Sequence, residues 1–407
     1  MKLILICIIS ALICTIQGNG MVFTPHHPII IIIGTRPEAI KMMPVYKALK
    51  HAQLPVLLCN TGQHADMVHD ILSLFEVKAD IELNCMKQGQ DLFDITQAVL
   101  AKTKEVFNTI KPSLVLVQGD TTSAFAAGLA AFYLHIPVGH VEAGLRTGNV
   151  YAPFPEEFNR SAISLFAQYH FAPTQRAVQI LRDLGVNPKT IFCTGNTVVD
   201  ALQEIEEKLR THMLEVNKQL ATIIHNARAQ EHKIMLLTAH RRESVGQGFI
   251  SIFNGIKQAL NTHKNITIIY PRHPNPAIKQ ALQKTKLEQS KNIYITEPLN
   301  YKDLVYVLSN VDGVMTDSGG LQEEALSLGK PVFVLREHTE RSEGLETGLA
   351  KLIGTDTQAI YTHINIFMET RRHYRAPCLV YGDGQAAQRI LAIIQNNFSS
   401  STTDFTR

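Results

Sequence analysis

Short runs of apolar, largely β-branched residues alternate with helical stretches along nearly the whole chain, and this alternation constrains the fold more than any other feature. It is typical of parallel sheets built from strand–helix–strand units, in which each strand is buried on both faces. We therefore predict an α/β protein with two series of strands. The first series is 29–33, 56–59, 114–117, 138–141, 169–172 and 191–194, and the second is 234–238, 266–270, 293–295, 313–316 and 332–335.

The length of 407 residues exceeds that of an ordinary single core, and typical domain sizes of about 150 to 200 residues suggest two domains. A polar stretch at 198–230 separates the two series, and we interpret it as a solvated surface helix at the domain boundary. The predicted organisation is a first domain at 21–200, a second at 201–384, a C-terminal helix at 385–398 that can pack on either domain, and a frayed tail at 399–407.

The composition excludes several classes of protein. Hydrophobic residues at 45% and charged residues at 18% are typical of a globular chain. A net charge of +3 without a concentrated basic stripe argues against nucleic acid as the main partner. The six cysteines form no CxxC pair, so neither a zinc site nor a disulfide framework is indicated. A reducing compartment is expected.

The N-terminal segment, 1–20, permits two interpretations. Lys2 and the mostly apolar run 3–16 have the size of a signal-peptide core, and the run is too short to span a bilayer comfortably. Alternatively, these residues are an extension that precedes Met21, which lies just before the first convincing strand. We expect a cytoplasmic protein without stable membrane association, with export as the alternative.

The motif GTRPEAIK, residues 34–41, follows the first expected strand. Gly34 permits a tight turn, and Pro37 suits the first turn of a helix whose unpaired N–H groups face the loop. Such a helix start favours anions, and Arg36 and Lys41 add two cations near it. A diphosphate is the natural ligand, and the alternative is that both cations are ordinary surface charges.

Three isolated carboxylates lie at loop positions in the first half. Asp120 follows a strand in QGDTTS, Glu142 follows the next strand in PVGHVEAGLRTG, and Glu156 lies among prolines in PFPEEFNR. Crowding and burial raise the pKa of a carboxyl group toward neutrality, which suits acid and base catalysis. Asp120 can instead serve only as a helix cap, and that alternative stays open at this point.

The second half presents basic and glycine-rich loops after its strands. LTAHRRES places His240, Arg241 and Arg242 at the side that faces the first domain, where His240 is interpreted as a phosphate or leaving-group contact. YPRHPNP, residues 270–276, is another loop of this kind, although its basic residues can equally be exposed.

The strongest nucleotide signal is TDSGGLQEEA. Ser318, Gly319 and Gly320 can open a helix with bare N–H groups directed at phosphate, and Glu324, one turn later, can accept hydrogen bonds from both hydroxyls of a ribose. We also expect Arg341, in REHTERSEG, to clamp the phosphate-bearing ligand. Neither GxGxxG nor GxxxxGK[ST] occurs, so dinucleotide and NTPase interpretations are weak, and no cluster of metal ligands is found.

Taken together, these motifs resemble the non-hydrolysing UDP-N-acetylglucosamine 2-epimerases from about residue 29 to residue 394. The matching segments are GTRPEAIK, GDTTS, PVGHVEAGLRTG, PEEFNR, GNTVVDAL, AHRRES, TDSGGLQEEA, GKPV, TERSEG and YGDGQA. The resemblance implies a glycosyltransferase-B-like fold with two Rossmann-like domains and an active site in the cleft between them. UDP would bind mainly to the second domain.

The resemblance also implies roles for individual residues. Contacts to UDP-N-acetylglucosamine would come from Arg36, Lys41, Asp120, Glu142, His240, Ser318, Gly319, Gly320, Glu324 and Arg341. The catalytic residues would be Asp120, Glu142 and Glu156, with His240 assisting the leaving group. Neither a cofactor nor a metal ion would be needed, a homodimer is the family expectation, and the product would serve a bacterial surface polysaccharide.

Some details depart from the family, and four rival functions remain. TGQHADM has Ala65 where the regulated members carry an arginine, which puts allosteric activation in doubt, and YPRHPNP has Arg272 where an apolar residue is usual. A hydrolysing epimerase would open with a motif like GTRADYGK. A relative that acts on UDP-2,3-diacetamido-glucuronate would open with one like GARPQFIK, which this chain also lacks. A glycosyltransferase would not need three acids in the first domain, and a catalytically dead UDP-sugar sensor would not be expected to keep them.

Overall fold

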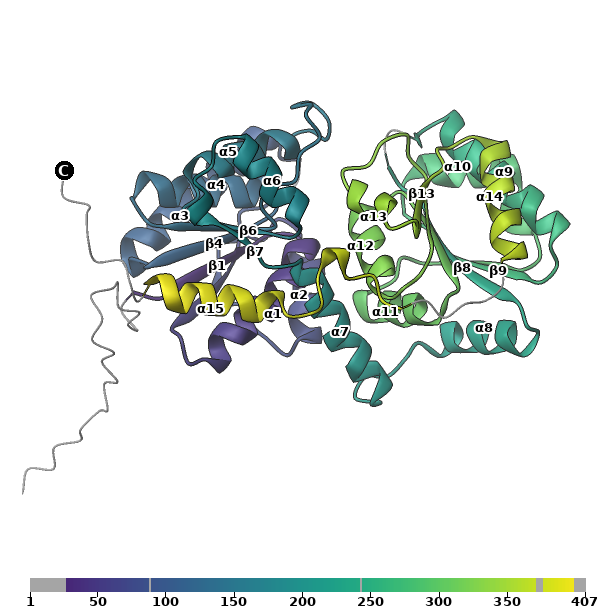
Figure 1. Ribbon diagram of the computed structural model, residues 1–407, viewed down its shortest axis with the longest axis horizontal. Helices are drawn as coiled ribbons and strands as arrows, with labels where there is room; N and C mark the ends of the chain where they lie inside the picture. Colours follow the sequence, from purple (N-terminus) through teal and green to yellow (C-terminus); the bar gives the residue numbers. More distant parts are fainter. Residues whose placement is uncertain (1–26, 88, 242–243, 371–375, 399–407) are drawn as a thin grey trace, which may run out of the picture.

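The structure, a computed structural model, describes residues 27–87, 89–241, 244–370 and 376–398. Two α/β halves lie side by side, and each contains one parallel sheet (Figure 1). The first sheet has seven strands in the order β3-β2-β1-β4-β5-β6-β7, and the second has six in the order β10-β9-β8-β11-β12-β13. The predicted fold class is confirmed.

All of the predicted strands occur, and no predicted strand end differs from the observed one by more than one residue. The first sheet contains β1 (Ile29–Ile33), β2 (Val56–Asn60), β3 (Ile81–Glu82), β4 (Leu114–Gln118), β5 (Val138–Val141), β6 (Tyr169–Ala172) and β7 (Ile191–Cys193). The second contains β8 (Lys233–Thr238), β9 (Ile266–Pro271), β10 (Ile293–Thr296), β11 (Gly313–Thr316), β12 (Val332–Val334) and β13 (Ala350–Leu352). The sequence missed β3 and β13, which are short edge strands with little apolar pattern of their own.

The helices follow the strands in alternation. The first half contains α1 (Arg36–His51), α2 (Ala65–Leu74), α3 (Leu92–Ile110), α4 (Thr122–Tyr133), α5 (Glu156–Phe166), α6 (Gln175–Asp183) and α7 (Thr197–Arg210). The second half contains α8 (Lys218–Ala229), α9 (Gln247–Thr262), α10 (Pro276–Thr285), α11 (Tyr301–Asn310), α12 (Gly319–Ser327), α13 (Ser342–Glu346) and α14 (Thr357–Glu369), and α15 (Ala386–Phe398) ends the described chain.

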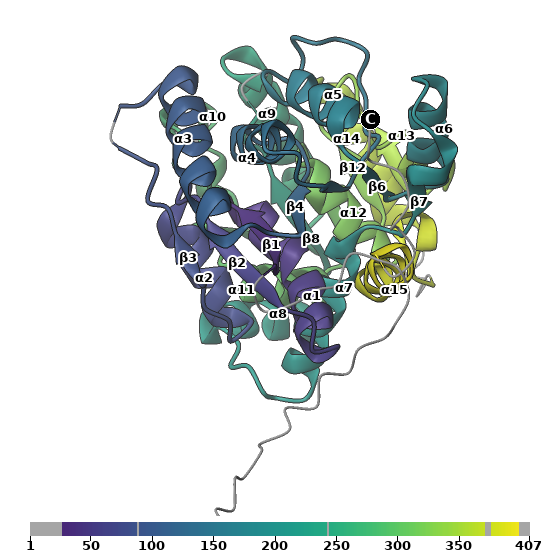
Figure 2. The same ribbon diagram turned by 90° about the vertical axis from the view of Figure 1, so that its left-hand side faces the viewer.

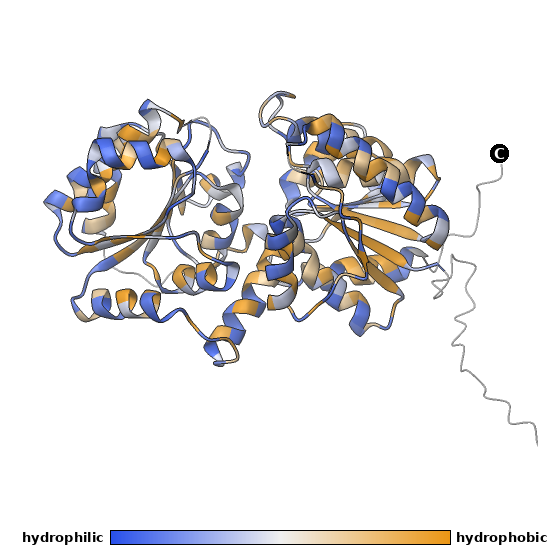
Figure 3. Ribbon diagram, turned by 180° about the vertical axis from the view of Figure 1, so that it is seen from behind, coloured by the Kyte–Doolittle hydropathy of each residue, from blue (hydrophilic) through white to orange (hydrophobic). Residues whose placement is uncertain are grey.

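Strand β1 explains why its apolar run forms the centre of the first sheet. All five isoleucines are fully buried, and they alternate between two apolar clusters. Ile29, Ile31 and Ile33 pack with residues of α1, α2, α7 and α15, whereas Ile30 and Ile32 pack with residues of α3, α4 and α5. Figure 2 shows helices on both faces of this sheet, and Figure 3 shows apolar strands enclosed by helices that turn polar residues outward.

The polar stretch 198–230 forms two helices, α7 and α8, and the prediction of a solvated helix is wrong for α7. Val198, Leu202 and Ile205 of α7 are buried, and the helix packs against α1 and α15 of one half and α11 and α12 of the other. Exposed charges such as Glu207 and Arg210 lie on its opposite face. The predicted domain boundary at 200/201 therefore falls within a helix that both halves share.

Helix α15 returns to the first half, where it lies along α1 and α7 (Figure 1). The carboxylate of Asp200 in α7 accepts hydrogen bonds from the N–H groups of Ala386 (3.2 Å) and Ala387 (2.8 Å). Asp200 thus holds the start of α15. The predicted N-terminal segment 1–20 and tail 399–407 lie outside the described residues.

Candidate active site

Side chains that follow the carboxyl ends of both sheets meet between the two halves. Lys41 and Glu142 come from the first half, and Glu323 and Arg341 come from the second. A cavity of about 620 Å³ lies beside them and is lined from both halves, with Arg146 among its cationic residues. The carboxyl edge of a parallel sheet is where such folds bind ligands, so this is the candidate active site.

A buried network of ion pairs joins the halves at this point. Lys41 Nζ bonds Glu142 Oε2 and lies 4.0 Å from Glu323 Oε2. Arg341 Nε donates to Glu323 Oε1 (2.8 Å), and Arg341 Nη2 lies 3.5 Å from Glu142 Oε1. Asn196 Nδ2 donates to the other oxygen of Glu323 (2.9 Å). The four charged residues are each less than 10% exposed. Each cation lies between one carboxylate of the first half and one of the second.

The network determines the charge state of its cations. Burial alone would lower the pKa of Lys41, but Glu142 and Glu323 outweigh it and raise that pKa above its ordinary value. Burial likewise opposes charge on Arg341, and Glu323, Glu340 and Glu142 together raise its pKa. Both cations therefore remain charged, which suits an anionic ligand.

Glu142 stands in a strained position directly after β5. Its φ angle is +64°, in the left-handed region, which costs a residue other than glycine on the order of 1 kcal/mol or more. Lys41 and Gln118 Nε2 (2.9 Å) hold its Oε2. Strain of this kind is common where a side chain must be aimed at a reaction, and it supports a functional role for Glu142.

Asp120 follows β4, and it does not cap α4. That cap is Thr121, whose Oγ1 accepts from the N–H of Ala124 (3.0 Å), so the alternative of a merely capping Asp120 is excluded. The carboxylate instead accepts from Arg160 Nη1 (2.9 Å). Burial raises the pKa of Asp120 to about 6, with Arg160 opposing the rise and Glu142 adding to it. An aspartate with this pKa can exchange protons near neutral pH.

Glu156 is the first residue of α5, and its neighbour Glu157 has a different environment. The Oε2 atom of Glu156 is buried and has no hydrogen-bond partner among the described residues. Glu157, in contrast, accepts from the N–H groups of Thr147 (3.1 Å) and Gly148 (3.2 Å) and pairs with Arg160. Glu157 thus fixes the loop, while Glu156 keeps an unpaired oxygen, as a proton-transfer group would.

The loop after β1 is tightly packed and spans the gap between the halves. A Cβ at Gly34 would lie 2.3 Å from Thr61 Oγ1 and 2.6 Å from Ser123 Oγ, so only glycine fits. Arg36 Nη2 donates to the carbonyl oxygen of Leu299 in the second half (3.3 Å). Burial lowers the pKa of Arg36, an effect that nearby Glu324 opposes. Arg36 is therefore a partly buried cation between the two halves rather than a surface charge.

His240 lies at the end of β8, with one face on His273 at a ring-centroid distance of 5.5 Å. Its Nδ1 lies 3.1 Å from Asp317 Oδ1, and Asp317 Oδ2 accepts from the N–H groups of His240 (2.6 Å) and Arg241 (2.8 Å). Asp317 thus fixes the ring and leaves Nε2 available for a ligand. Arg242 lies outside the described residues.

Helix α12 begins as the glycine-rich motif predicted. Ser318 occupies the N-cap position, but its side chain makes no capping hydrogen bond, so its hydroxyl remains available. A Cβ at Gly319 would lie 3.1 Å from Glu340 Oε1 and 3.2 Å from Arg341 Cζ, whereas one at Gly320 would meet nothing within 4 Å. The helix start therefore presents N–H groups to open space beside Arg341.

Glu324 lies one turn into α12 and is 6% exposed. Burial raises its pKa to about 7, and the hydroxyl of buried Tyr301 opposes the rise. Such a carboxyl group is ready to accept hydrogen bonds from sugar hydroxyls when it is ionised. Its position one turn after Ser318 agrees with the predicted ribose contact, which stays a prediction.

The sequence analysis missed several residues that position the site: Glu38, Gln118, Arg160, Asp317 and Glu323. Only Glu38 carried a local signal, because Thr35-x-x-Glu38 has the spacing of a capping box. The others act through partners distant in sequence, as Glu323 does with Asn196, 127 residues away. No pattern along the chain reveals such contacts.

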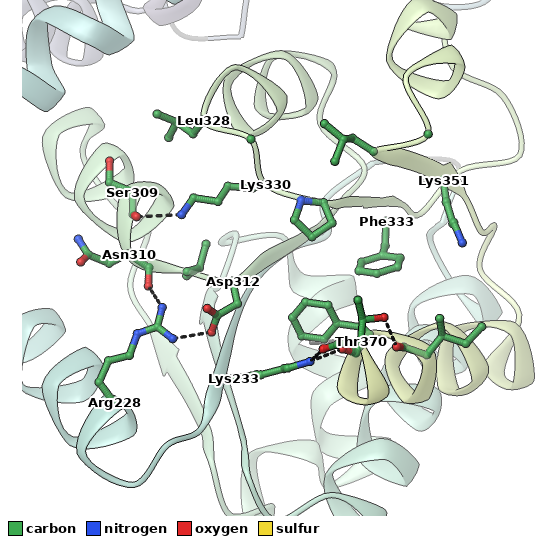
Figure 4. Close-up of a pocket in the computed structure, with 17 residues that line it drawn as sticks. Arg228, Lys233, Ser309, Asn310, Asp312, Leu328, Lys330, Phe333, Lys351 and Thr370 are labelled. Atoms are coloured by element: carbon green, nitrogen blue, oxygen red, sulfur yellow. Dashed lines mark hydrogen bonds and ion pairs between the residues drawn. The ribbon is translucent and has the colours of Figure 1, made fainter. Parts of the chain in front are cut away.

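A second cavity, of about 490 Å³, lies at the amino-terminal edge of the second sheet, away from the site (Figure 4). Arg228 and Lys330 donate to the carbonyl oxygens of the last two residues of α11 (2.6 Å and 3.0 Å). Lys233 donates to the carbonyl oxygen of Phe367 in the last turn of α14 (2.6 Å). Helices of this fold end at this edge, so these cations are explained as C-terminal caps.

Three further features of the described residues bear on the predictions. No group of three or more His, Cys, Asp or Glu side chains is arranged there to hold a metal ion. Cys59, Cys85, Cys193 and Cys378 form no disulfides. No described helix has both the length and the apolar character needed to cross a membrane.

Two parallel α/β halves that present acids, cations and a glycine-rich helix start across one cleft define an enzyme of the glycosyltransferase-B-like class. A glycosyltransferase from Rickettsia africae shares this fold, with a TM-score of 0.56 and 11% identity over 92% of this chain and 99% of that one. Residues 47–395 match the sequence profile described as UDP-N-acetylglucosamine 2-epimerase. The chain belongs to this family, and the predicted resemblance is confirmed.

The relatives cover nearly the whole chain. A UDP-N-acetylglucosamine 2-epimerase from Campylobacter jejuni is 42% identical over 90% of this chain and 97% of its own length. The Escherichia coli enzyme of that name is 42% identical over 91% and 98%. A crystal structure of UDP-GlcNAc 2-epimerase from Neisseria meningitidis bound to UDP-GlcNAc has a TM-score of 0.83 and 40% identity, covering 91% of this chain and 100% of that one.

Proposed function

We propose that this protein is a non-hydrolysing UDP-N-acetylglucosamine 2-epimerase that interconverts UDP-N-acetylglucosamine and UDP-N-acetylmannosamine. One observation carries the proposal: acids of the first half meet a cation and a glycine-rich helix start of the second, with Glu142 3.5 Å from Arg341. Family membership and the neighbour bound to UDP-GlcNAc support the same substrate. The first domain would supply the catalytic acids, and the second would bind UDP.

The chemistry requires UDP to leave before the sugar can be inverted. The proton on carbon 2, beside an acetamido group, is a poor acid. Cleavage of the bond between carbon 1 and the UDP oxygen sends its electron pair to UDP and makes that proton far more acidic. A carboxylate then removes the proton and 2-acetamidoglucal forms. Protonation of carbon 2 from the opposite face and re-addition of UDP to carbon 1 complete the inversion.

The acids would act on opposite faces of carbon 2. Asp120, with a pKa of about 6, can take up and release a proton near neutral pH. Glu142, held in its strained conformation by Lys41, and Glu156, with its unpaired buried oxygen, are the other two candidates.

The departing diphosphate would be held by cations and helix N–H groups. The start of α12, from Ser318 to Gly320, would bind it together with Arg36, His240 and Arg341, while Lys41 would neutralise adjacent charge. Preorganised donors stabilise developing negative charge strongly where water is excluded. Retention of UDP also places it for re-addition, which a hydrolysing enzyme would not need.

Deuterium incorporation separates this function from its rivals. The protein is incubated with UDP-N-acetylglucosamine in deuterated water, and the products are followed by NMR. Deuterium at carbon 2 of UDP-N-acetylmannosamine is expected. Release of free N-acetylmannosamine would indicate a hydrolysing epimerase, and a lack of turnover without an added acceptor would indicate a transferase. Either result would reject the proposal.

A homodimer is also proposed, and an apolar surface on the first half supports it. Phe132 (48% exposed), Tyr133 (63%), Phe158 (48%) and Leu165 (89%) lie on the adjacent helices α4 and α5. Exposed apolar surface of this kind is typical of an interface between identical chains. Light scattering should give twice the chain mass of 45.3 kDa, and Leu165→Glu should halve it. A wild-type monomer would contradict this part.

The cellular context is proposed from the substrate. Nucleotide sugars for surface polysaccharides are made in the cytoplasm, so we expect the enzyme there and its product in surface glycan synthesis. Cell fractionation and N-terminal sequencing of the native protein test the location. A protein found outside the cytoplasm without residues 1–20 would contradict it.

A further inference from the structure

Glu38 is a buried carboxylate to which the proposed reaction gives no role. It is fully buried within α1, and its carboxylate accepts four hydrogen bonds. Oε2 accepts from the N–H groups of Gly34 (3.0 Å) and Thr35 (2.7 Å) and from the hydroxyl of Thr35 (2.8 Å). Oε1 accepts from the hydroxyl of Thr121 (2.6 Å). Burial raises the pKa of Glu38, and the hydrogen bonds from Thr121, Thr35 and Gly34 oppose that rise, so donors rather than a cation stabilise its ionised form.

These bonds connect two loops of the candidate site. Thr35 directly precedes Arg36, which bridges to the second half through Leu299. Thr121 directly follows Asp120 and caps α4. The two loops follow β1 and β4, which are neighbours in the sheet. The carboxylate of Glu38 therefore bonds to the chain neighbours of two proposed site residues. One is Arg36, a proposed diphosphate contact, and the other is Asp120, a proposed proton-transfer group.

A capping box at the start of α1 explains only part of this arrangement. In such a box, the third helical residue accepts from the N-cap N–H, as Glu38 does from Thr35. The box gives no reason for a bond to Thr121, which belongs to another helix 83 residues away. The oxygen of the Thr121 hydroxyl accepts a hydrogen bond from the N–H of Ala124, and its single hydrogen is donated to Glu38 Oε1. The bond between the loops is thus the distinctive feature.

We propose that Glu38 is a positioning residue, which holds the loop of Arg36 and the loop of Asp120 in one fixed geometry. The inference rests on the proposed function. Loss of UDP and removal of the carbon-2 proton involve adjacent carbon atoms, so the two groups must keep a constant separation. Displacement of a catalytic group by about 1 Å can cost on the order of 100-fold in rate. A buried carboxylate with four donors is rigid enough to prevent such displacement.

Thr121 offers a test that leaves the rest of the Glu38 network intact. Thr121→Val removes the bond between the loops, and Thr121→Ser retains it. We expect Thr121→Val to lower kcat at least about 10-fold and leave the Kd for UDP within about threefold, because UDP contacts lie mainly in the second half. Thr121→Ser should stay within about threefold of wild type in both. Glu38→Gln, which risks misfolding, should lower turnover and UDP affinity together.

Asp91→Ala is the matched control, because it removes the N-cap of α3, which packs against α4, without touching Glu38. Both cap variants should lower Tm by a few degrees, and only Thr121→Val should lower kcat. Equal kcat in Thr121→Val and wild type would overturn the inference alone. A fall in kcat matched by Asp91→Ala or unrescued by serine would overturn it as well. A wild-type protein that incorporates no deuterium would instead overturn the proposed function, and this inference with it.

Discussion

Alanine at Gly320 tests the proposed diphosphate site at the start of α12. Gly320 is the second residue of the helix, and a Cβ there would meet nothing within 4 Å in the protein. The folded chain therefore tolerates alanine, which also has a better helix propensity than glycine by up to about 1 kcal/mol. In a domain of 150 to 250 residues, a gain of that size raises Tm by about 2–4 °C.

The open space that the methyl group would occupy lies at the start of α12, where the helix N–H groups are unpaired. If a phosphate binds there, it must move back and lose one or two hydrogen bonds to a charged group, at about 1.5–3 kcal/mol each. The Kd for UDP should then rise by roughly 10-fold to 100-fold or more. Stability and affinity are thus predicted to change in opposite directions, a combination that misfolding cannot produce.

Calorimetric titration with UDP and thermal unfolding measure the two quantities on one preparation. Gly319→Ala is the comparison, because its Cβ would lie 3.2 Å from Arg341 Cζ and should disturb that side chain even without ligand. It should weaken UDP binding without the gain in Tm. An unchanged Kd for UDP in folded Gly320→Ala would refute the assignment of the diphosphate to this helix start.

Three further predictions concern charge and pH. Asp120→Asn should lower turnover roughly 10²- to 10⁴-fold and leave the UDP Kd nearly unchanged, and undiminished turnover would remove Asp120 from the mechanism. Arg160 lowers the pKa of Asp120, so Arg160→Gln should move the limb of the pH–rate profile near pH 6 to higher pH, and an unshifted limb would contradict this. Burial lowers the pKa of His140 to about 3, whereas its value in the unfolded chain is near 6.5. The contribution of neutral His140 to the free energy of unfolding is therefore complete above pH 6.5 and is lost as the pH falls toward 3. The loss amounts to about 1.4 kcal/mol per pH unit. Urea unfolding at pH 7.5 and pH 5 should show that the free energy of unfolding falls less in His140→Gln than in wild type. Exposed His51→Gln is the control. An equal fall in His140→Gln and wild type would contradict the prediction.

The sequence predicted the strands well because fully buried strands need apolar, β-branched residues whatever surrounds them. It missed β3, with two residues, because an edge strand of that length leaves almost no pattern. It also misjudged α7, since the many charges along that helix hid a narrow buried face. Val198, Leu202 and Ile205 follow helical spacing, but the partners that cover them come from α1 and α12, far away in the chain.

The same distinction holds for the site. The sequence by itself determined which residue types stand after which strands: GTRPEAIK after β1, Asp120 after β4, Glu142 after β5 and Ser318 after β11. It also determined the family, because these motifs are specific and local. A local motif can be recognised in the sequence because the backbone keeps residues that are close in sequence close in space.

Only the tertiary structure decided how these groups act on one another. The pairing of Lys41 with Glu142, the contact of Glu142 with Arg341, and the bond from Glu38 to Thr121 each join residues more than 80 positions apart. Burial, which raises the pKa of Asp120 to about 6, depends on the same long-range packing. Charge interactions depend on distance and solvent access, and both are properties of the folded chain rather than of its order of residues.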